Sequence, residues 1–183
     1  MKIPCISVMQ PHAQLIALNA KSIETRSRDF TGGYRGPLAI HASKGFPKAN
    51  RLLCWSEPFA SVLERANPDP QVSLDVLPLG CIVAVGDLVD VVRILPYEQK
   101  GFTLAAKRVN EHLGTALNRG YDRYQQEIAF GDYGPGRWML LLSNVVALPK
   151  PIPAKGRLGL WEWEAPDDVV RLLDGVEHNE LPH

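Results

Sequence analysis

The chain has 183 residues, of which 45% are hydrophobic and 22% charged, and its basic and acidic residues balance at twenty each. That length suits one globular domain with a sizeable core. No apolar run approaches the roughly 20 residues that cross a bilayer, and the N-terminus lacks a charged-then-apolar signal segment. Membrane-spanning and secreted classes are therefore excluded, and a cytoplasmic protein is expected.

Three cysteines stand far apart, at Cys5, Cys54 and Cys81. An odd number without metal-ligand spacing indicates reduced core thiols, with one reactive cysteine as the alternative. The sequence also contains no Walker loop and no G-x-S-x-G elbow, and its Gly131-x-x-Gly134-x-Gly136 run does not follow a strand, so a dinucleotide site is rejected. No metal and no cofactor are expected.

Charge is distributed unevenly along the chain. Residues 1–51 hold eight basic and two acidic residues, whereas 161–183 hold one basic and seven acidic residues. This asymmetry favours an anionic ligand near the N-terminal third and a solvated acidic tail. The alternative is that the tail folds back and neutralises the basic face.

The chain begins with a predicted strand at 2–9 and a helix at 11–18. Pro11 suits a first helical position, and Asn19 tolerates the left-handed turn that ends such a helix. A short strand at 23–27 follows.

Next, a glycine-containing loop at 29–36 leads to a strand at 37–43. Helical apolar spacing over 47–66 is broken at Pro58, which predicts two short helices. A proline-containing linker at 67–72 precedes a long apolar run at 80–95, expected to be the central strand.

The second half predicts a helix at 103–117 and a segment at 118–133 that is interpreted as an insertion over the cleft. The later elements are a strand at 138–146, a proline-rich connector at 149–153, a last strand at 157–164 and a short helix at 167–173. Strands dispersed in this way do not make a βαβ repeat. They predict an α+β fold, a mixed β-barrel flanked by short helices, over 1–165, with an acidic tail from 166 to 183.

The most informative stretch joins the first helix to the second strand. Alternation on the strand places Glu24 and Arg26 on one face, while Lys21 falls at the bend. Lysine and arginine together commonly hold phosphate, the first as a point charge and the second as a bidentate fork. Glu24 can fix Arg26 in place or accept from a base amino group. The alternative is that Glu24 and Arg26 form a rim salt bridge; Lys21 has no obvious partner in the sequence.

This stretch, Asn19-x-Lys21-x-x-Glu24-x-Arg26, resembles the G-x-K-x-x-E-x-R signature of the ASCH domain, a branch of the PUA-like superfamily, with Asn19 in place of glycine. Its flanks resemble the same family in the segments Ile6–Pro11, Tyr34–Ser43, Phe130–Trp138 and Lys155–Trp161. The resemblance implies a PUA-like barrel and recognition of RNA or a nucleotide.

Further residues are candidates for the same cleft. The flanking motifs and their aromatic and polar side chains supply the ligand-binding candidates Ser7, Gln10, Arg26, Arg35, Ser43, Asp132, Tyr133, Arg137 and Trp138. Aromatic rings among them could stack on a base, as in single-stranded RNA recognition. His41 is either a general base or a buried histidine bonded to a carbonyl, and we favour the second interpretation.

The favoured hypothesis is a module that binds single-stranded RNA or a modified nucleoside. The alternative is a metal-independent hydrolase with Lys21, Glu24 and His41 as catalytic candidates. Some ASCH proteins hydrolyse N4-acylated cytidine with a lysine, a threonine and a glutamate; Lys21 matches that lysine, but Glu24 takes the threonine position. A ribonuclease would use Lys21 and Arg26 on the phosphorane, with His41 or Tyr133 transferring protons.

Overall fold

The computed structural model describes residues 1–69, 71–96, 107–113 and 121–174. Its strands form one mixed six-stranded sheet in the order β2-β5-β4-β3-β1-β6. β1 runs parallel to β3, and the other neighbours are antiparallel. The strands are β1 (Lys2–Val8), β2 (Ile23–Arg26), β3 (Gly36–Ala42), β4 (Cys81–Arg93), β5 (Trp138–Pro153) and β6 (Leu160–Glu164).

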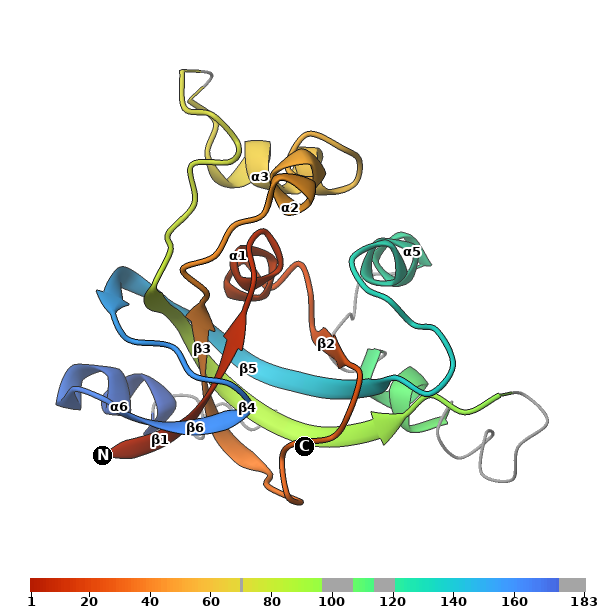
Figure 1. Cartoon of the computed structure of the whole chain (residues 1–183), viewed down its shortest axis with the longest axis vertical. Helices are drawn as coiled ribbons and strands as arrows, with labels where there is room; N and C mark the ends of the chain where they lie inside the picture. Colours follow the sequence, from red (N-terminus) through yellow and green to blue (C-terminus); the bar gives the residue numbers. More distant parts are fainter. Residues whose placement is uncertain (70, 97–106, 114–120, 175–183) are drawn as a thin grey trace, which may run out of the picture.

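The α+β class and the mixed sheet with short helices are confirmed. The sheet is strongly curved (Figure 1), but its pairing runs from β2 to β6 without joining these two edge strands. The predicted barrel is therefore open along one side.

The helices cover both faces of the curved sheet. On its concave side, Figure 1 shows α1 (His12–Ala17) and α5 (Tyr121–Ala129), with α2 (Lys48–Leu53) and α3 (Phe59–Ala66) stacked above α1. On the convex side, α6 (Asp167–Asp174) packs against the sheet through the buried Val169. The two short helices predicted within 47–66 and the helix predicted at 167–173 are thus present.

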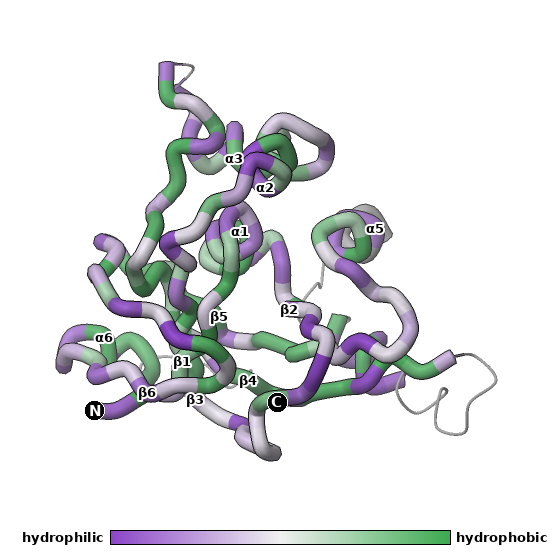
Figure 2. The backbone as a smooth tube through the Cα atoms, viewed as in Figure 1, coloured by the Kyte–Doolittle hydropathy of each residue, from purple (hydrophilic) through white to green (hydrophobic). Residues whose placement is uncertain are grey.

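Alternating residues of β1, β3 and β4 pack into two separate hydrophobic clusters on opposite faces of the sheet. Figure 2 shows hydrophobic residues on both the strands and the helices. The concave core gathers residues such as Ile6, Ile40 and Leu140 under α1. The convex core gathers Cys5, Ala39 and Ile82 under α6. As predicted, Leu38, Ile40 and Ala42 share one face of β3, opposite to Ala39.

The prediction of a connector at the proline-rich segment 149–153 is wrong. It continues β5, since Ile152 and Pro153 pair with Ile82 and Cys81 of β4. Over this length β5 has lost β2, which pairs only with 138–141. Over 149–153, the edge of β5 that faces away from β4 pairs with no described strand. Prolines at alternate positions there remove no hydrogen bond of the sheet.

Two other expectations lie only partly within the described residues. Of the helix predicted at 103–117, residues 107–113 are helical, and the remainder lies outside the described residues. The segment at 118–133 contains α5, while 118–120 lies outside them. In the described part of the chain, no helix is both long enough and apolar enough to cross a membrane.

The cysteines are core residues. Cys5, Cys54 and Cys81 are free and buried. Burial raises the pKa of the Cys54 thiol to about 11 and raises the pKa of Cys5 further. Both thiols stay protonated at neutral pH, as expected of inert core cysteines.

Candidate functional site

The bend between α1 and β2 has the conformation that the sequence predicts. Asn19 adopts a positive φ of 54° and its amide donates to the Val145 carbonyl at 3.0 Å. The N–H groups of Ala20 and Lys21 both donate to the Leu15 carbonyl, at 2.9 and 3.2 Å. These bonds close the helix end and turn the Lys21 side chain toward the interior.

Lys21 is the largest fully buried side chain of the described residues, at 1% exposure. Its ammonium lies 3.5 Å from Glu127 Oε1, and neither side chain of this pair is exposed. The Lys21 ammonium also lies 5.9 Å from the centre of the Tyr133 ring. Sequence reasoning did not find this partner, because Glu127 lies 106 positions away in the segment interpreted as an insertion.

Glu127 does more than neutralise Lys21. Its Oε2 accepts from the Ser22 N–H at 2.6 Å, and its Oε1 accepts from the Ile23 N–H at 3.3 Å and the Tyr133 hydroxyl at 2.9 Å. Ile23 is the first residue of β2, an edge strand of the sheet, and Ser22 precedes it. One carboxylate of α5 therefore accepts from the two amides at the start of this edge, which would otherwise remain unpaired.

Glu24 and Arg26 share the concave face, as predicted. Arg26 Nε lies 3.3 Å from Glu24 Oε1, with 28% and 11% of the two side chains exposed. Arg26 Nη2 donates to the Ser7 carbonyl at 2.7 Å, and the guanidinium lies 5.7 Å from the centre of the Phe30 ring. The guanidinium is thus held from three directions while part of it faces solvent.

Trp138 lies directly between two arginines on this face. In the register of the sheet it pairs with Arg26 on β2 and with Arg93 on β4. The Arg93 guanidinium is 5.9 Å from the centre of the indole. Residues opposite each other on antiparallel strands have side chains on the same face. We call these three residues, Arg26, Trp138 and Arg93, the Trp138 row.

Sequence reasoning missed two members of this region, Arg93 and His12. Arg93 ends the long apolar run of β4, and only the strand register places it beside Trp138. Burial lowers the pKa of His12, Glu24 raises it, and Lys21 and Arg26 lower it, so His12 lies within electrostatic range of all three. Its position after Gln10-Pro11 in the family-like motif was the available signal.

Ser7 and His41 lie on the opposite, convex face. His41 is 1% exposed; its Nδ1 lies 3.1 Å from Ser7 Oγ and its Nε2 lies 3.1 Å from the Ala154 carbonyl. Burial lowers the pKa of His41, which keeps the ring neutral. The geometry agrees with the interpretation of a buried histidine bonded to a carbonyl, and it separates His41 from Lys21 and Glu24.

The other candidates divide by location. Gln10 is buried, with its side chain bonded to the Pro78 carbonyl and the Gln14 N–H. Arg35 pairs with Asp90 at 3.2 Å, and the Ser43 N–H donates to the Val8 carbonyl at 2.8 Å. These contacts tie loops and strands together, and none of them involves a residue of the Trp138 row.

Asp132 and Arg137 form a pair beside β2. Arg137 Nη1 lies 3.3 Å from Asp132 Oδ2, and Arg137 Nη2 donates to the Thr25 carbonyl at 3.5 Å. Asp132 and Arg137 thus form an ion pair that is bonded to the backbone of the edge strand.

In fold, the chain is similar to an ASCH structure. The match is to the crystal structure of ASCH from Zymomonas mobilis, with 12% sequence identity and a TM-score of 0.43. It covers 94% of this chain and 93% of that chain. No protein-family model matches the chain. No curated protein matches it either. The likeness is one of fold, and the chemistry proposed below rests on the side chains of this chain.

Proposed function

We propose that the protein recognises single-stranded RNA or a nucleotide at the Trp138 row. The observation that carries the proposal is the placement of a half-buried indole between two arginines on adjacent strands. An aromatic ring offers a stacking surface to any base. Arginines on either side supply the phosphate contacts that a nucleotide needs on both of its ends.

Arg26 is the better prepared of the two arginines. Its Nη2 donates to the Ser7 carbonyl, and its Nε lies 3.3 Å from Glu24 Oε1 as an ion pair without a hydrogen bond, so the guanidinium is already held in place before any ligand arrives. A fixed guanidinium loses little side-chain entropy on binding phosphate. Glu24, still 11% exposed, is placed to accept from a base amino group such as N4 of cytosine.

Lys21 has a different part in this proposal. Its ammonium is enclosed with Glu127, and it holds the bend and β2 behind the row without touching the ligand. The hydrolase alternative requires Lys21 to reach a substrate, and that requires the Glu127 contact to open. The described geometry therefore favours binding over hydrolysis.

The test is a titration of a fluorescent eight-nucleotide single-stranded RNA in EDTA, with a denaturing gel of the same samples. Arg26→Ala and Trp138→Ala should each weaken binding roughly 10- to 100-fold, the cost of losing a charged hydrogen bond or a stacked base. Arg65→Ala, an exposed arginine on α3, is the matched control and should leave binding unchanged.

Two results would decide against the proposal. Binding that is equal in wild type, Arg26→Ala and Trp138→Ala would move the site elsewhere. Cleavage of the RNA in EDTA, abolished by Lys21→Ala in a folded protein, would instead establish the ribonuclease alternative.

A further inference from the structure

The loop between β5 and β6, residues 154–159, is built onto the convex face beside Ser7. Two of its carbonyls face inward: Ala154 lies 3.1 Å from His41 Nε2, and Arg157 accepts from the Ser7 hydroxyl at 3.0 Å. Trp161 Nε1 donates to the same hydroxyl at 3.3 Å. The loop backbone is therefore anchored at both ends of a four-residue span.

Gly156 shows how closely this loop is packed. A Cβ at this position would lie 2.3 Å from Cε1 and 2.7 Å from Nδ1 of His41. His41 is itself buried, and both of its ring nitrogens lie within hydrogen-bond distance of a partner. A side chain at 156 would therefore displace the loop or break the contacts of the His41 ring.

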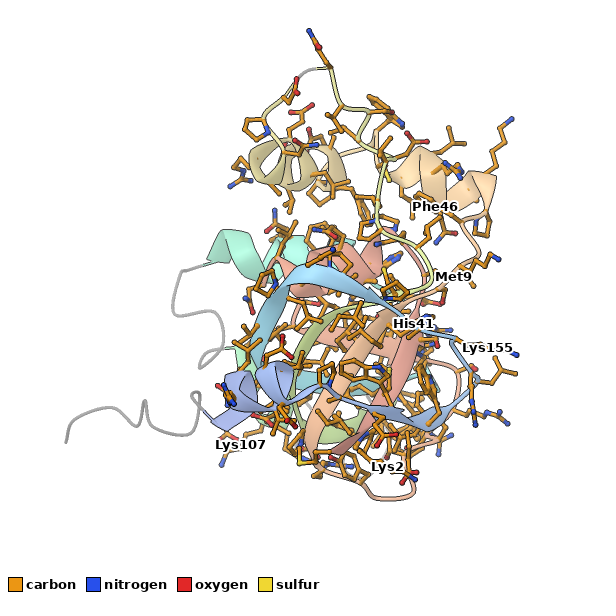
Figure 3. All side chains as sticks on the ribbon, turned by 90° about the vertical axis from the view of Figure 1, so that its left-hand side faces the viewer. Lys2, Met9, His41, Phe46, Lys107 and Lys155 are labelled. Atoms are coloured by element: carbon orange, nitrogen blue, oxygen red, sulfur yellow. The ribbon has the colours of Figure 1, made fainter. Side chains whose placement is uncertain are left out.

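The backbone carbonyls of the loop bond to the body of the protein, and the loop side chains point to solvent. Lys155, Arg157 and Leu158 are all exposed, and Leu158 is 96% exposed. Figure 3 shows Lys155 extending from the body on the side where Met9 and His41 lie. Two cations are thus displayed on a fixed backbone.

A third cation belongs to the same surface. Lys44 lies against Gly80, where a Cβ would be 3.8 Å from Lys44 Cβ, and the Gly80 carbonyl accepts from the Ala154 N–H at 3.0 Å. The two segments involved, 43–51 and 154–159, carry five basic residues and no acidic residue. We call Lys44, Lys155 and Arg157 the basic rim.

Ser7 links the Trp138 row to the loop that carries the basic rim. The Ser7 carbonyl accepts from Arg26 Nη2 at 2.7 Å, while the Ser7 hydroxyl donates to the Arg157 carbonyl. The Arg26 guanidinium and the backbone of the loop therefore contact the same residue near the end of β1, from its two sides.

We propose that the basic rim binds the backbone phosphates of single-stranded RNA whose base is held at the Trp138 row. This inference rests on the proposed function and adds the direction in which the strand leaves the site. The rim contacts phosphates only, so it contributes affinity and salt dependence without base preference.

The test compares two ligands, cytidine monophosphate and an eight-nucleotide RNA, on the wild-type protein and on Lys155→Ala/Arg157→Ala. The double variant should bind the mononucleotide as the wild type does and bind the RNA roughly tenfold more weakly. Its plot of log affinity against log salt should be shallower by about 1.4, since each lost single-strand phosphate contact accounts for about 0.7.

The matched control is Lys2→Ala/Lys107→Ala, which removes two exposed lysines lying away from the loop (Figure 3). Gly156→Ala is a second probe, because it displaces the loop while retaining every charge. It should weaken RNA binding and leave mononucleotide binding unchanged.

Each outcome has a defined meaning. If both double variants bind the RNA equally, the rim proposal is overturned while the Trp138 row stands. If the wild type binds neither ligand, the proposed function fails and the rim fails with it. Loss of binding to vesicles of phosphatidylserine in Lys155→Ala/Arg157→Ala, with RNA binding unaltered, would reassign the rim to a lipid surface.

Discussion

Lys21 and Glu127 form a fully enclosed ion pair, 3.5 Å apart, between the bend before β2 and helix α5. The residue that dominates the family-like signature is thus a buried cation with a dedicated anion. Its partner also caps the amides of an edge strand. The pair joins two segments that lie 106 positions apart in the sequence.

Glu127→Gln should be strongly destabilising. It leaves the Lys21 charge buried without a counter-ion, which costs about 3–5 kcal/mol of unfolding free energy. Chemical denaturation measures this loss. The double variant Lys21→Met/Glu127→Gln should recover part of it, because the buried charge is gone. A single variant as stable as wild type would contradict the role of Glu127 as the necessary counter-ion of Lys21.

Asn19 provides a test of the bend itself. Its φ of 54° suits glycine, while a β-branched residue is strained there. Asn19→Gly should change stability by less than about 1 kcal/mol, and Asn19→Val should cost about 1–3 kcal/mol more than that. Thermal melting of the two variants in parallel gives the comparison. Equal melting temperatures would contradict the assigned turn.

The buried histidines predict a loss of stability in mild acid. Burial lowers the pKa of His41 below its ordinary value of 6.5. As the pH falls below 6.5, His41 therefore binds a proton in the unfolded chain before it does so in the native chain. Proton uptake by the unfolded state alone favours unfolding, so stability falls as the pH drops from 7 toward 5.

His12 and His112 have pKa values lowered by the same cause and contribute in the same direction. His41→Gln should therefore reduce the pH dependence of the unfolding free energy by up to about 1.4 kcal/mol per pH unit. Urea denaturation at pH 5, 6 and 7 measures the slope. An unchanged slope in the variant would mean that His41 titrates normally in the native protein.

Local sequence signals predicted much of the fold. Asn19 ends α1 in the left-handed conformation, Pro58 separates two helices, and β4 follows the apolar run at 80–95. Alternation alone placed Glu24 and Arg26 on one face. Each of these features depends on residues close together in the chain.

What the sequence did not reveal depends on strand register and long-range packing. Proline at 149, 151 and 153 predicted a connector, yet the segment is part of β5. A strand can hold these prolines because the neighbouring strand β2 ends before it reaches them. Arg93 joins Trp138 only through the β4–β5 ladder, and Glu127 reaches Lys21 only through the docking of α5. No pattern within one segment carries that information.

We propose above all that Arg26 of the Trp138 row contacts the RNA. Nitrogen-15 NMR of the arginine Nε–H groups, during titration with the eight-nucleotide RNA, tests it most directly. The Arg26 signal should shift to saturation with the same midpoint as the binding curve, while the signal of Arg65 on α3 stays in place. Saturable binding with an unmoved Arg26 signal would contradict the account and place the RNA on another surface.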